Sequence, residues 1–343
     1  MMRLPLSWLL AFTTAALALL LLGSLATGPM TLTLGESLWA LFAGQESGIE
    51  SHKLLIVQEI RLPRTLLCIA VGGILGLCGA VMQGLFRNPL ADPGIIGVSG
   101  GAALGAALAI VLLAPLGQHL QATIGVGLLP LLAFLGGALT TTLVYLLGTR
   151  EGGTSVTVML LAGVAITALS GAVIGLLTYL ADDQMLRNLS LWQMGTLAAG
   201  KPADVALALL TLVALLWLFM RDANPLNALL LGEGEARHLG VNVQSLKRRL
   251  ILLTAAGVGV AVAVSGMIGF VGLVVPHLVR LLAGPNHVRL LPLSALLGAA
   301  LLLAADMLAR TLLAPAELPV GIITALLGAP FFIWLLVKGR RAL

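Results

Sequence analysis

One stretch of the chain has the spacing of a phosphate-binding loop. Gly195 is followed by four residues and then by Gly200 and Lys201, which fits the pattern G-x-x-x-x-G-K. Pro202, however, stands where a Ser or Thr would hold Mg²⁺, and no strand-like segment precedes the glycine. We therefore predict that this chain has no ATP site of its own and no nucleotide-hydrolysing domain.

Other side chains that could do chemistry are few and scattered. The histidines lack the H-E-x-x-H spacing or any other metal-ligand spacing, so no metal site is predicted. His277 and Arg280 share a helix face beside Pro276. They could line a gate or an ion path, or form a polar helix end packed against its neighbours. Asp306 and Arg310 are four residues apart, which predicts an ion pair that faces protein.

The two cysteines, Cys68 and Cys78, lie ten residues apart in one apolar run. A helix separates such positions by about 15 Å, which is too far for a disulfide. We therefore expect two small, buried core residues.

Ion-coupled transporters usually carry a relay of Asp, Glu or His inside the membrane, and the sequence shows no obvious relay of this kind.

Composition indicates which elements must position these side chains. Of the 343 residues, 59% are hydrophobic and only 10% are charged, and the mean hydropathy is +1.08. Soluble domains carry roughly 25% charged residues. A soluble enzyme, a disordered chain and a coiled coil are excluded, and the composition predicts an all-α polytopic membrane protein. The 41 glycines, with G-x-x-x-G steps at Gly72–Gly76 and Gly97–Gly101–Gly105, predict close helix packing.

Apolar runs predict ten membrane spans. The first follows Arg3 and is too long for a signal-peptide core, so we interpret it as an uncleaved helix. The run at 250–283 is too long for one span and contains a turn-forming group of glycines, so we divide it into two short spans. The predicted runs are 4–26, 65–84, 95–114, 124–147, 156–180, 203–220, 250–283 (as two), 291–309 and 318–337.

The distribution of basic residues predicts the orientation. With an internal N-terminus, 13 of the 19 Lys and Arg residues fall in inner segments, which agrees with the positive-inside rule and with both termini in the cytoplasm. The outer basic residues are then Lys53, Arg61, Arg64, Arg187, Lys201 and Arg310.

Two polar segments interrupt the spans. Residues 27–64 form an outer segment with several glutamates, and residues 221–249 form the longest inner segment. In the inner segment, Asn224-Pro225 can begin a helix with Leu226, Leu229 and Leu230 on one face, and glycines divide the remainder into short helices. An ordered, partly apolar inner segment predicts either a docking surface or a helix that rests on lipid headgroups.

A weak internal repeat is also present. Residues Arg61 to Gly84 and Lys247 to Phe270 share an order of basic residues, apolar run and glycine-rich end, and the first enters from outside and the second from inside. Oppositely oriented halves are typical of inverted-repeat transporters, whose path lies at the interface between the halves.

Several ordered motifs resemble one family. They are Arg61-Leu-Pro-Arg-Thr65, Gly79-Ala-Val-Met-Gln-Gly84, Arg87-Asn-Pro-Leu-Ala-Asp-Pro93, Gly97-Val-Ser-Gly100, Leu230-Leu-Gly-Glu233, Ala236-Arg-His-Leu-Gly240, Gly269-Phe-Val-Gly-Leu273 with Pro276-His277, Ala316-Glu-Leu-Pro-Val-Gly321 and Leu327-Gly-Ala-Pro330. In order and spacing, from about residue 55 to the C-terminus, they resemble the FecCD-type permeases, the membrane subunits of ABC importers for iron-siderophores, haem and cobalamin.

The resemblance implies a type II importer permease in which residues 1–343 form a single transmembrane domain. It implies a bacterial inner-membrane location and a homodimer with the substrate path along the dimer axis. It also implies two copies of a separate ATPase, which binds ATP and Mg²⁺, and one periplasmic substrate-binding protein. No cofactor is then expected on this chain.

The resemblance also suggests roles for individual residues. Leu230, Gly232, Glu233, Glu235 and Ala236 resemble the coupling helices that seat on the ATPase. Arg61, Arg64 and Arg310 resemble outer arginines that pair with acidic residues of the binding protein, a role that suits exposed guanidiniums; headgroup anchoring is the alternative. Thr154, Ser155 and Thr157 lie where the family narrows its inner gate, and His277 is a further candidate for the gate or path.

No motif specifies the substrate. The stretch from Leu191 to Val205 and the C-terminal stretch from Ala316 to Leu336 resemble the haem permeases most, so haem is the expected cargo, with a ferric siderophore or cobalamin as alternatives. Two readings from other classes stay open. A stand-alone secondary transporter or channel would need an ion-coupling site within the spans, and a membrane-embedded enzyme would need clustered catalytic carboxylates or histidines at depth.

Overall fold

The computed structural model describes residues 5–30, 32–42, 50–113, 127–150, 153–198 and 200–340. The ends of three predicted spans, at residues 4, 114 and 124–126, lie outside this part of the chain. Within it, every predicted span coincides with a helix. These are α1 (Leu6–Ala26), α4 (Leu62–Leu85), α5 (Val98–Val111), α7 (Leu128–Gly148), α8 (Val156–Leu180), α10 (Pro202–Arg221), α13 (Val243–Ser265), α14 (Val271–Ala283), α15 (His287–Thr311) and α16 (Val320–Arg340).

Seven of these helices are long and apolar enough to cross a bilayer, if α4 is counted with the helical turns that precede it. The other three, α5, α14 and α16, are apolar but offer shorter apolar stretches. Short helices are tolerated in a membrane where neighbouring protein covers their ends. The fold is therefore an all-helical membrane bundle, as the composition predicts.

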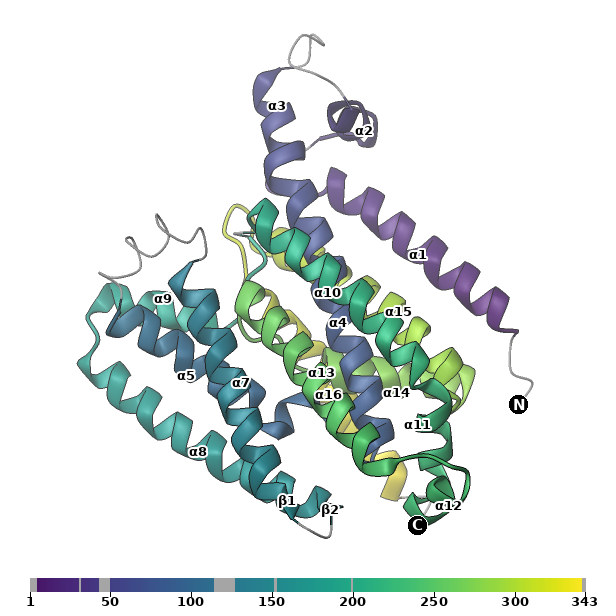
Figure 1. The fold of residues 1–343 in the computed structure, drawn as a ribbon. Helices are drawn as coiled ribbons and strands as arrows, with labels where there is room; N and C mark the ends of the chain where they lie inside the picture. Colours follow the sequence, from purple (N-terminus) through teal and green to yellow (C-terminus); the bar gives the residue numbers. More distant parts are fainter. Residues whose placement is uncertain are drawn as a thin grey trace.

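Helix α4 runs through the middle of the bundle and contacts α10, α13, α14 and α15 (Figure 1). Its approach to α15 is very close, because a Cβ atom on Gly72 would overlap the carbonyl of Gly298 and one on Gly76 would overlap that of Ser294. Only glycine permits backbones to meet at this distance. The close packing predicted from the Gly72–Gly76 step is confirmed.

A second group of helices, α5, α7 and α8, packs together at one side of the bundle (Figure 1). Here Gly101 faces the carbonyl of Gly136 and Gly105 faces that of Leu132, so α5 and α7 also meet through backbone. Helix α9 (Asp183–Gln193) lies across the end of α5. Helix α8 has most of its side chains exposed, and these are predominantly apolar.

The outer segment is more helical than its composition suggests. It contains α2 (Leu34–Phe42), α3 (Ser51–Leu55) and the π-helical stretch η1 (Ile56–Arg61), which continues directly into α4. Helix α4 begins three residues before the predicted start of this span at residue 65, but helical structure continues upstream of it to Ser51. Leu54 and Val57 pack with Ala40 in a small second core, and this packing extends the helix beyond the apolar run that the sequence marks.

The long run at 250–283 is two helices, as predicted. Helix α13 ends at Ser265 and α14 begins at Val271, and both Gly266 and Phe270 have positive φ angles of 68°. A backbone in this conformation cannot continue a right-handed helix. The break is shorter than the glycine pattern suggested, because Gly272 lies inside α14, where it meets Gly79 of α4.

The opposite end of the bundle carries the inner segment. A two-stranded hairpin, β1 (Thr149–Arg150) and β2 (Gly153–Thr154), joins α7 to α8. Helices α11 (Ala223–Leu230) and α12 (Glu233–His238) lie at the same end (Figure 1). Helices α4 and α13 run past each other in opposite directions (Figure 1), and this direction fits the predicted repeat, which itself stays a prediction. The turn η2 (Pro93–Ile96) leads into α5.

Candidate functional site

Helix α11 is fixed to the bundle at its start and along one face. Leu226 and Leu229 are fully buried, whereas Leu230 is exposed. The amide of Asn227 donates to Asn286 at 2.9 Å, and its oxygen accepts the backbone N–H of His287 at 2.8 Å. The predicted apolar face is therefore confirmed at two of its three leucines, and α11 is held directly against the start of α15.

Helix α12 follows a sharp turn at Gly232, whose φ of 122° is a conformation that L side chains rarely adopt. Ala236 is fully buried beneath the helix, but Leu231 and Leu239 are 67% and 63% exposed at its two ends. With Leu230, they give this end of the bundle three exposed leucines, and exposed apolar side chains of this kind suit contact with another protein or with lipid.

The five predicted coupling residues therefore have different environments. Leu230 and Glu235 are exposed, and Gly232 makes the turn. Glu233 is only half-exposed because its carboxylate pairs with Lys247 at 2.6 Å. Ala236 does not reach the surface at all. Sequence reasoning missed Leu231 and Leu239 as surface residues, although both lie inside the motifs that carry the resemblance.

The predicted gate residues lie together at the start of α8. Thr154 is buried at the end of β2, Ser155 caps α8 by accepting the backbone N–H of Val158, and Thr157 is exposed on the first turn. The backbone N–H of Thr154 donates to Gln244 Oε1 at 3.1 Å, and its carbonyl accepts a hydrogen bond from Lys247 Nζ at 3.1 Å. Both partners are on α13.

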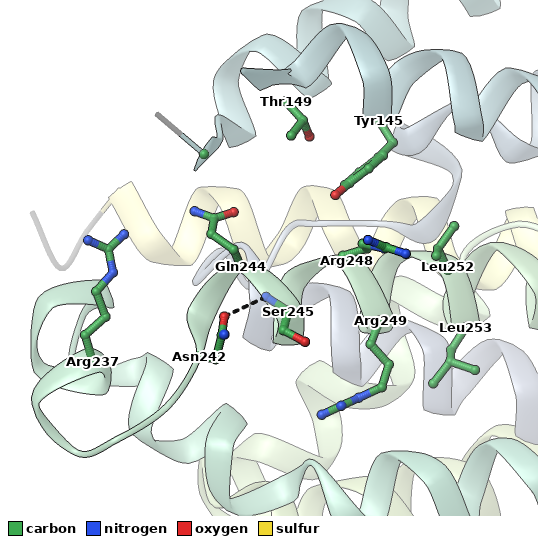
Figure 2. Close-up of a pocket in the computed structure, with 11 residues that line it drawn as sticks. Tyr145, Thr149, Arg237, Asn242, Gln244, Ser245, Arg248, Arg249, Leu252 and Leu253 are labelled. Atoms are coloured by element: carbon green, nitrogen blue, oxygen red, sulfur yellow. Dashed lines mark hydrogen bonds between the residues drawn. The ribbon is translucent and has the colours of Figure 1, made fainter. Parts of the chain in front are cut away.

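An open cleft of about 870 Å³ lies beside this hairpin. Figure 2 shows Tyr145 and Thr149 on one wall and Gln244, Ser245 and Arg248 on the other. Arg249 points away from the cleft towards Asp222, with which it forms an ion pair. The cleft separates the inner end of α7 from the first turns of α13.

His277 has a different environment from the other gate candidates. It lies on α14, and its ring meets that of Phe331 on α16 edge to face, with 6.3 Å between the ring centroids. Arg280, one turn later, donates to Gln83 on α4. This geometry matches the interpretation of a polar helix end packed against its neighbours, and a gating role for His277 stays a prediction.

At the outer end, the three predicted docking arginines are buried. Arg61, Arg64 and Arg310 are 3%, 5% and 2% exposed, so the expectation of exposed guanidiniums is wrong for this chain on its own. Arg61 donates to the backbone carbonyls of Leu25 and Ala26, the last two residues of α1, and to that of Met30 beyond it. These carbonyls end a helix and need donors, which the guanidinium supplies.

Asp306 organises the other two arginines. Its Oδ1 lies 2.9 Å from Arg64 Nη2, and its Oδ2 lies 3.0 Å from Arg310 Nε. The predicted pair of Asp306 with Arg310 is confirmed. Arg64 also pairs with Glu317 at 2.7 Å, and Arg310 donates to Ser24 at 2.8 Å. The Arg64–Asp306 contact joins residues 242 apart, and no local pattern could have indicated it.

The residues that could bind a metal or nucleotide are sparse. In the described part of the chain, no group of three or more His, Cys, Asp or Glu side chains lies close enough to hold a metal ion. The stretch from Gly195 to Lys201 connects α9 to α10, and its Ala199 lies outside the described residues. Thr196 donates its N–H to the carbonyl of Ser265, so this stretch packs on the end of α13.

Comparison with known proteins identifies a consistent group of relatives. The model of the FecCD transport family matches residues 16–338. The chain is 46% identical over 336 residues to the hemin transport system permease protein HmuU of Yersinia pestis, with 97% of this chain and 96% of that protein covered. It is 42% identical over 334 residues to the vitamin B12 import system permease protein BtuC of Shigella boydii, with the same coverage.

Solved structures agree with these relatives. A metal-chelate type ABC transporter in an inward-facing conformation superposes with a TM-score of 0.82 at 34% identity, over 97% of this chain and 100% of that chain. The PsaBC structure from Streptococcus pneumoniae, in complex with a Fab, gives a TM-score of 0.58 at 20% identity, over 81% and 91% of the two chains. At that identity the second match shows a shared fold.

Proposed function

This chain belongs to the FecCD transport family and is the membrane-spanning permease subunit of an ABC importer, and from that premise we propose that it moves haem across the inner membrane of a bacterium. The choice of haem as the cargo rests on the 46% identity to a hemin permease over nearly the whole of both chains. Cobalamin is the second candidate, supported by several cobalamin permeases at 42–44% identity. A ferric siderophore is the third.

The proposed assembly is a homodimer with two ATPase subunits and one periplasmic binding protein, and both termini lie in the cytoplasm. The exposed apolar side chains of α8 support a large apolar interface on that side, which either a second copy or lipid covers. ATP and Mg²⁺ are bound by the ATPase subunits, and haem is cargo rather than a cofactor of this chain.

The ATPase docks, in this proposal, on α11 and α12. The patch of Leu230, Leu231 and Leu239, with Glu235 beside it, supports this surface. A substitution at Ala236 tests packing rather than docking because that side chain is buried. We therefore expect Leu231→Arg to weaken binding of the ATPase subunit, measured by co-purification. Leu55→Arg, at an exposed leucine of α3 at the opposite end of the bundle, is the matched control. Equal retention of the ATPase by both variants would contradict the docking surface.

The binding protein docks, in this proposal, at the outer arginines through an exchange of partners. Glu317 is partly exposed and holds Arg64 at 2.7 Å, so an acidic side chain of the binding protein can compete with it for the same guanidinium. Glu317→Gln should then strengthen docking and Arg64→Gln should weaken it, more so at low salt. Docking affinity that is unchanged in both variants would contradict the exchange.

The decisive experiment is uptake into proteoliposomes that contain this chain and its ATPase, with binding protein and haem on one side and ATP on the other. ATP-dependent haem entry is the expected result. Entry of cobalamin or a ferric siderophore with the matched binding protein, without entry of haem, would support the importer function and contradict haem as its cargo. Uptake that persists without the ATPase would instead support a stand-alone transporter.

A further inference from the structure

Lys247 is a buried cation that joins two separate segments of the inner face. It lies in the second turn of α13 and is only 2% exposed. Its ammonium group is 2.6 Å from Glu233 Oε1 on α12 and 3.1 Å from the carbonyl oxygen of Thr154 on β2. A buried ammonium group is costly unless it is paired and hydrogen-bonded, so both contacts are required for this side chain to stay where it is.

The hairpin is held by a second residue of the same helix face. Gln244, one turn before Lys247, accepts the backbone N–H of Thr154 at 3.1 Å. Its amide also fills the space in which a Cβ atom of Gly153 would lie, and Gly153 has a positive φ of 113°. The N–H and the C=O of Thr154 are therefore both bonded to α13, and β2 cannot shift along α13 without losing both bonds.

The neighbouring charged side chains do not offer Lys247 an acidic partner that could replace Glu233. Arg237 lies 3.8 Å from Glu233 and competes for the same carboxylate, whereas the carboxylate of Asp222 is taken by Arg249. Among the described residues, Glu233 is the acid within ion-pair distance of Lys247. The open cleft beside the hairpin lies between the end of α7 and the first turns of α13, so side chains do not fill the space between these two elements there (Figure 2).

We propose that Lys247 is a positioning residue that links α12 to the β1–β2 hairpin, so that movement of α12 shifts the start of α8. We call Glu233, Lys247 and Thr154 the Lys247 clamp. The inference rests on the proposed function, in which the ATPase docks on α11 and α12, and on the expectation from the family resemblance that the inner gate narrows near Thr154. Because the ammonium group stays buried only while both partners are bound, α12 and the hairpin move as one unit. Without the clamp, α12 moves and α8 does not follow.

The test uses the reconstituted complex with its ATPase and binding protein, and it compares Lys247→Met with Lys201→Met, the same change at an exposed outer position. Two quantities are measured: substrate molecules moved per ATP hydrolysed, and the ATP-dependent change in distance between spin labels at Val158→Cys in the two copies. Val158 is exposed on α8, and the native Cys68 and Cys78 are fully buried, so labelling is confined to the new thiol.

We expect Lys247→Met to lower the transport-to-ATP ratio by about fivefold or more, the range of typical coupling between sites, and to abolish the change in label distance. Basal ATP hydrolysis should persist, and Lys247→Arg, which keeps a charged donor, should restore most of the ratio. Lys201→Met should behave as wild type. A residue needed only for folding would lower yield and both rates together.

Two results would overturn the proposal. One is an unchanged ratio and label response in Lys247→Met. The other is a proportional loss of transport and ATP hydrolysis in Lys247→Met, with neither rate restored in Lys247→Arg. The ATP-dependent change in label distance does not depend on the cargo, so it still tests the Lys247 clamp if the transported substrate is not haem. A wild-type complex that responds to ATP in neither measurement contradicts the proposed function, and the clamp with it.

Discussion

Replacing Asp306 with Asn should destabilise this chain more than any other single loss of charge at the outer end. Asp306 is fully buried and lies within 3.0 Å of both Arg64 and Arg310. Asparagine keeps the shape but removes the negative charge, so two buried guanidiniums are left with Glu317, which reaches only Arg64. Breaking a buried ion pair by removing one partner costs about 3–5 kcal/mol.

That cost corresponds to between about two and four factors of ten in the ratio of folded to unfolded protein. The matched control is Glu317→Gln. Its carboxylate is partly exposed, and partly exposed pairs contribute about 1 kcal/mol or less. The structure therefore predicts a clear ranking, with Asp306→Asn far more destabilising than Glu317→Gln, and this ranking holds even if both absolute values change in detergent.

The chain carries its own reporter for this measurement. Cys68 and Cys78 are both fully buried in α4, so a thiol-reactive fluorogenic dye labels them only after unfolding. Thermal unfolding in detergent, followed with such a dye, should show a lower midpoint for Asp306→Asn than for Glu317→Gln. Cys78 lies further from the substitution and provides the cleaner signal. Equal midpoints for the two variants would refute the view that Asp306 holds the two arginines in place.

Two further predictions concern other regions. Gly298→Ala should cost about 1–3 kcal/mol, because its Cβ would overlap the carbonyl of Gly72. Gly171→Ala, where a Cβ meets nothing within 4 Å, should leave the dye-detected midpoint unchanged, and equal effects would contradict the close contact of α4 with α15. At the outer surface, the hydrogen bond from Lys53 lowers the pKa of Glu36 from 4.5 to about 2. Because the folded-state pKa is the lower one, the stabilisation is present above pH 4.5 and lost as the pH falls towards 2. The difference in midpoint between wild type and Glu36→Gln should therefore shrink between pH 6 and pH 3, and a constant difference would contradict it.

The role of the sequence is clearest in the number and type of elements. Apolar runs indicated the ten apolar helices among the described residues, because a bilayer core requires long uncharged stretches whatever the tertiary arrangement. The division of residues 250–283 followed from length and glycine content alone. The helical turns of α3 and η1 that precede α4 could not be predicted in this way, because they are stabilised by contact with α2 rather than by apolar composition.

For the candidate sites, motifs indicated which residues to examine but not what surrounds them. Arg61, Arg64 and Arg310 were expected at the surface, since the family resemblance gives them a docking role that suits exposed guanidiniums. The structure buries them because carboxylates and helix-end carbonyls from distant segments converge there. Ala236 was likewise expected at a docking surface, although a small apolar residue between charged ones fits equally well beneath a short helix.

The sequence by itself determined that this protein lies in a membrane, where its ten apolar helices lie, and the family to which it belongs, because these depend on composition and on motifs that are local in the chain. Apart from the local pair of Asp306 with Arg310, only the tertiary structure decided which groups the buried charges contact. Asp306 with Arg64, and Lys247 with Thr154, join residues 242 and 93 positions apart. The physical reason is that burial makes a charge depend on its partner, and partners are chosen by the packing of helices rather than by their order in the chain.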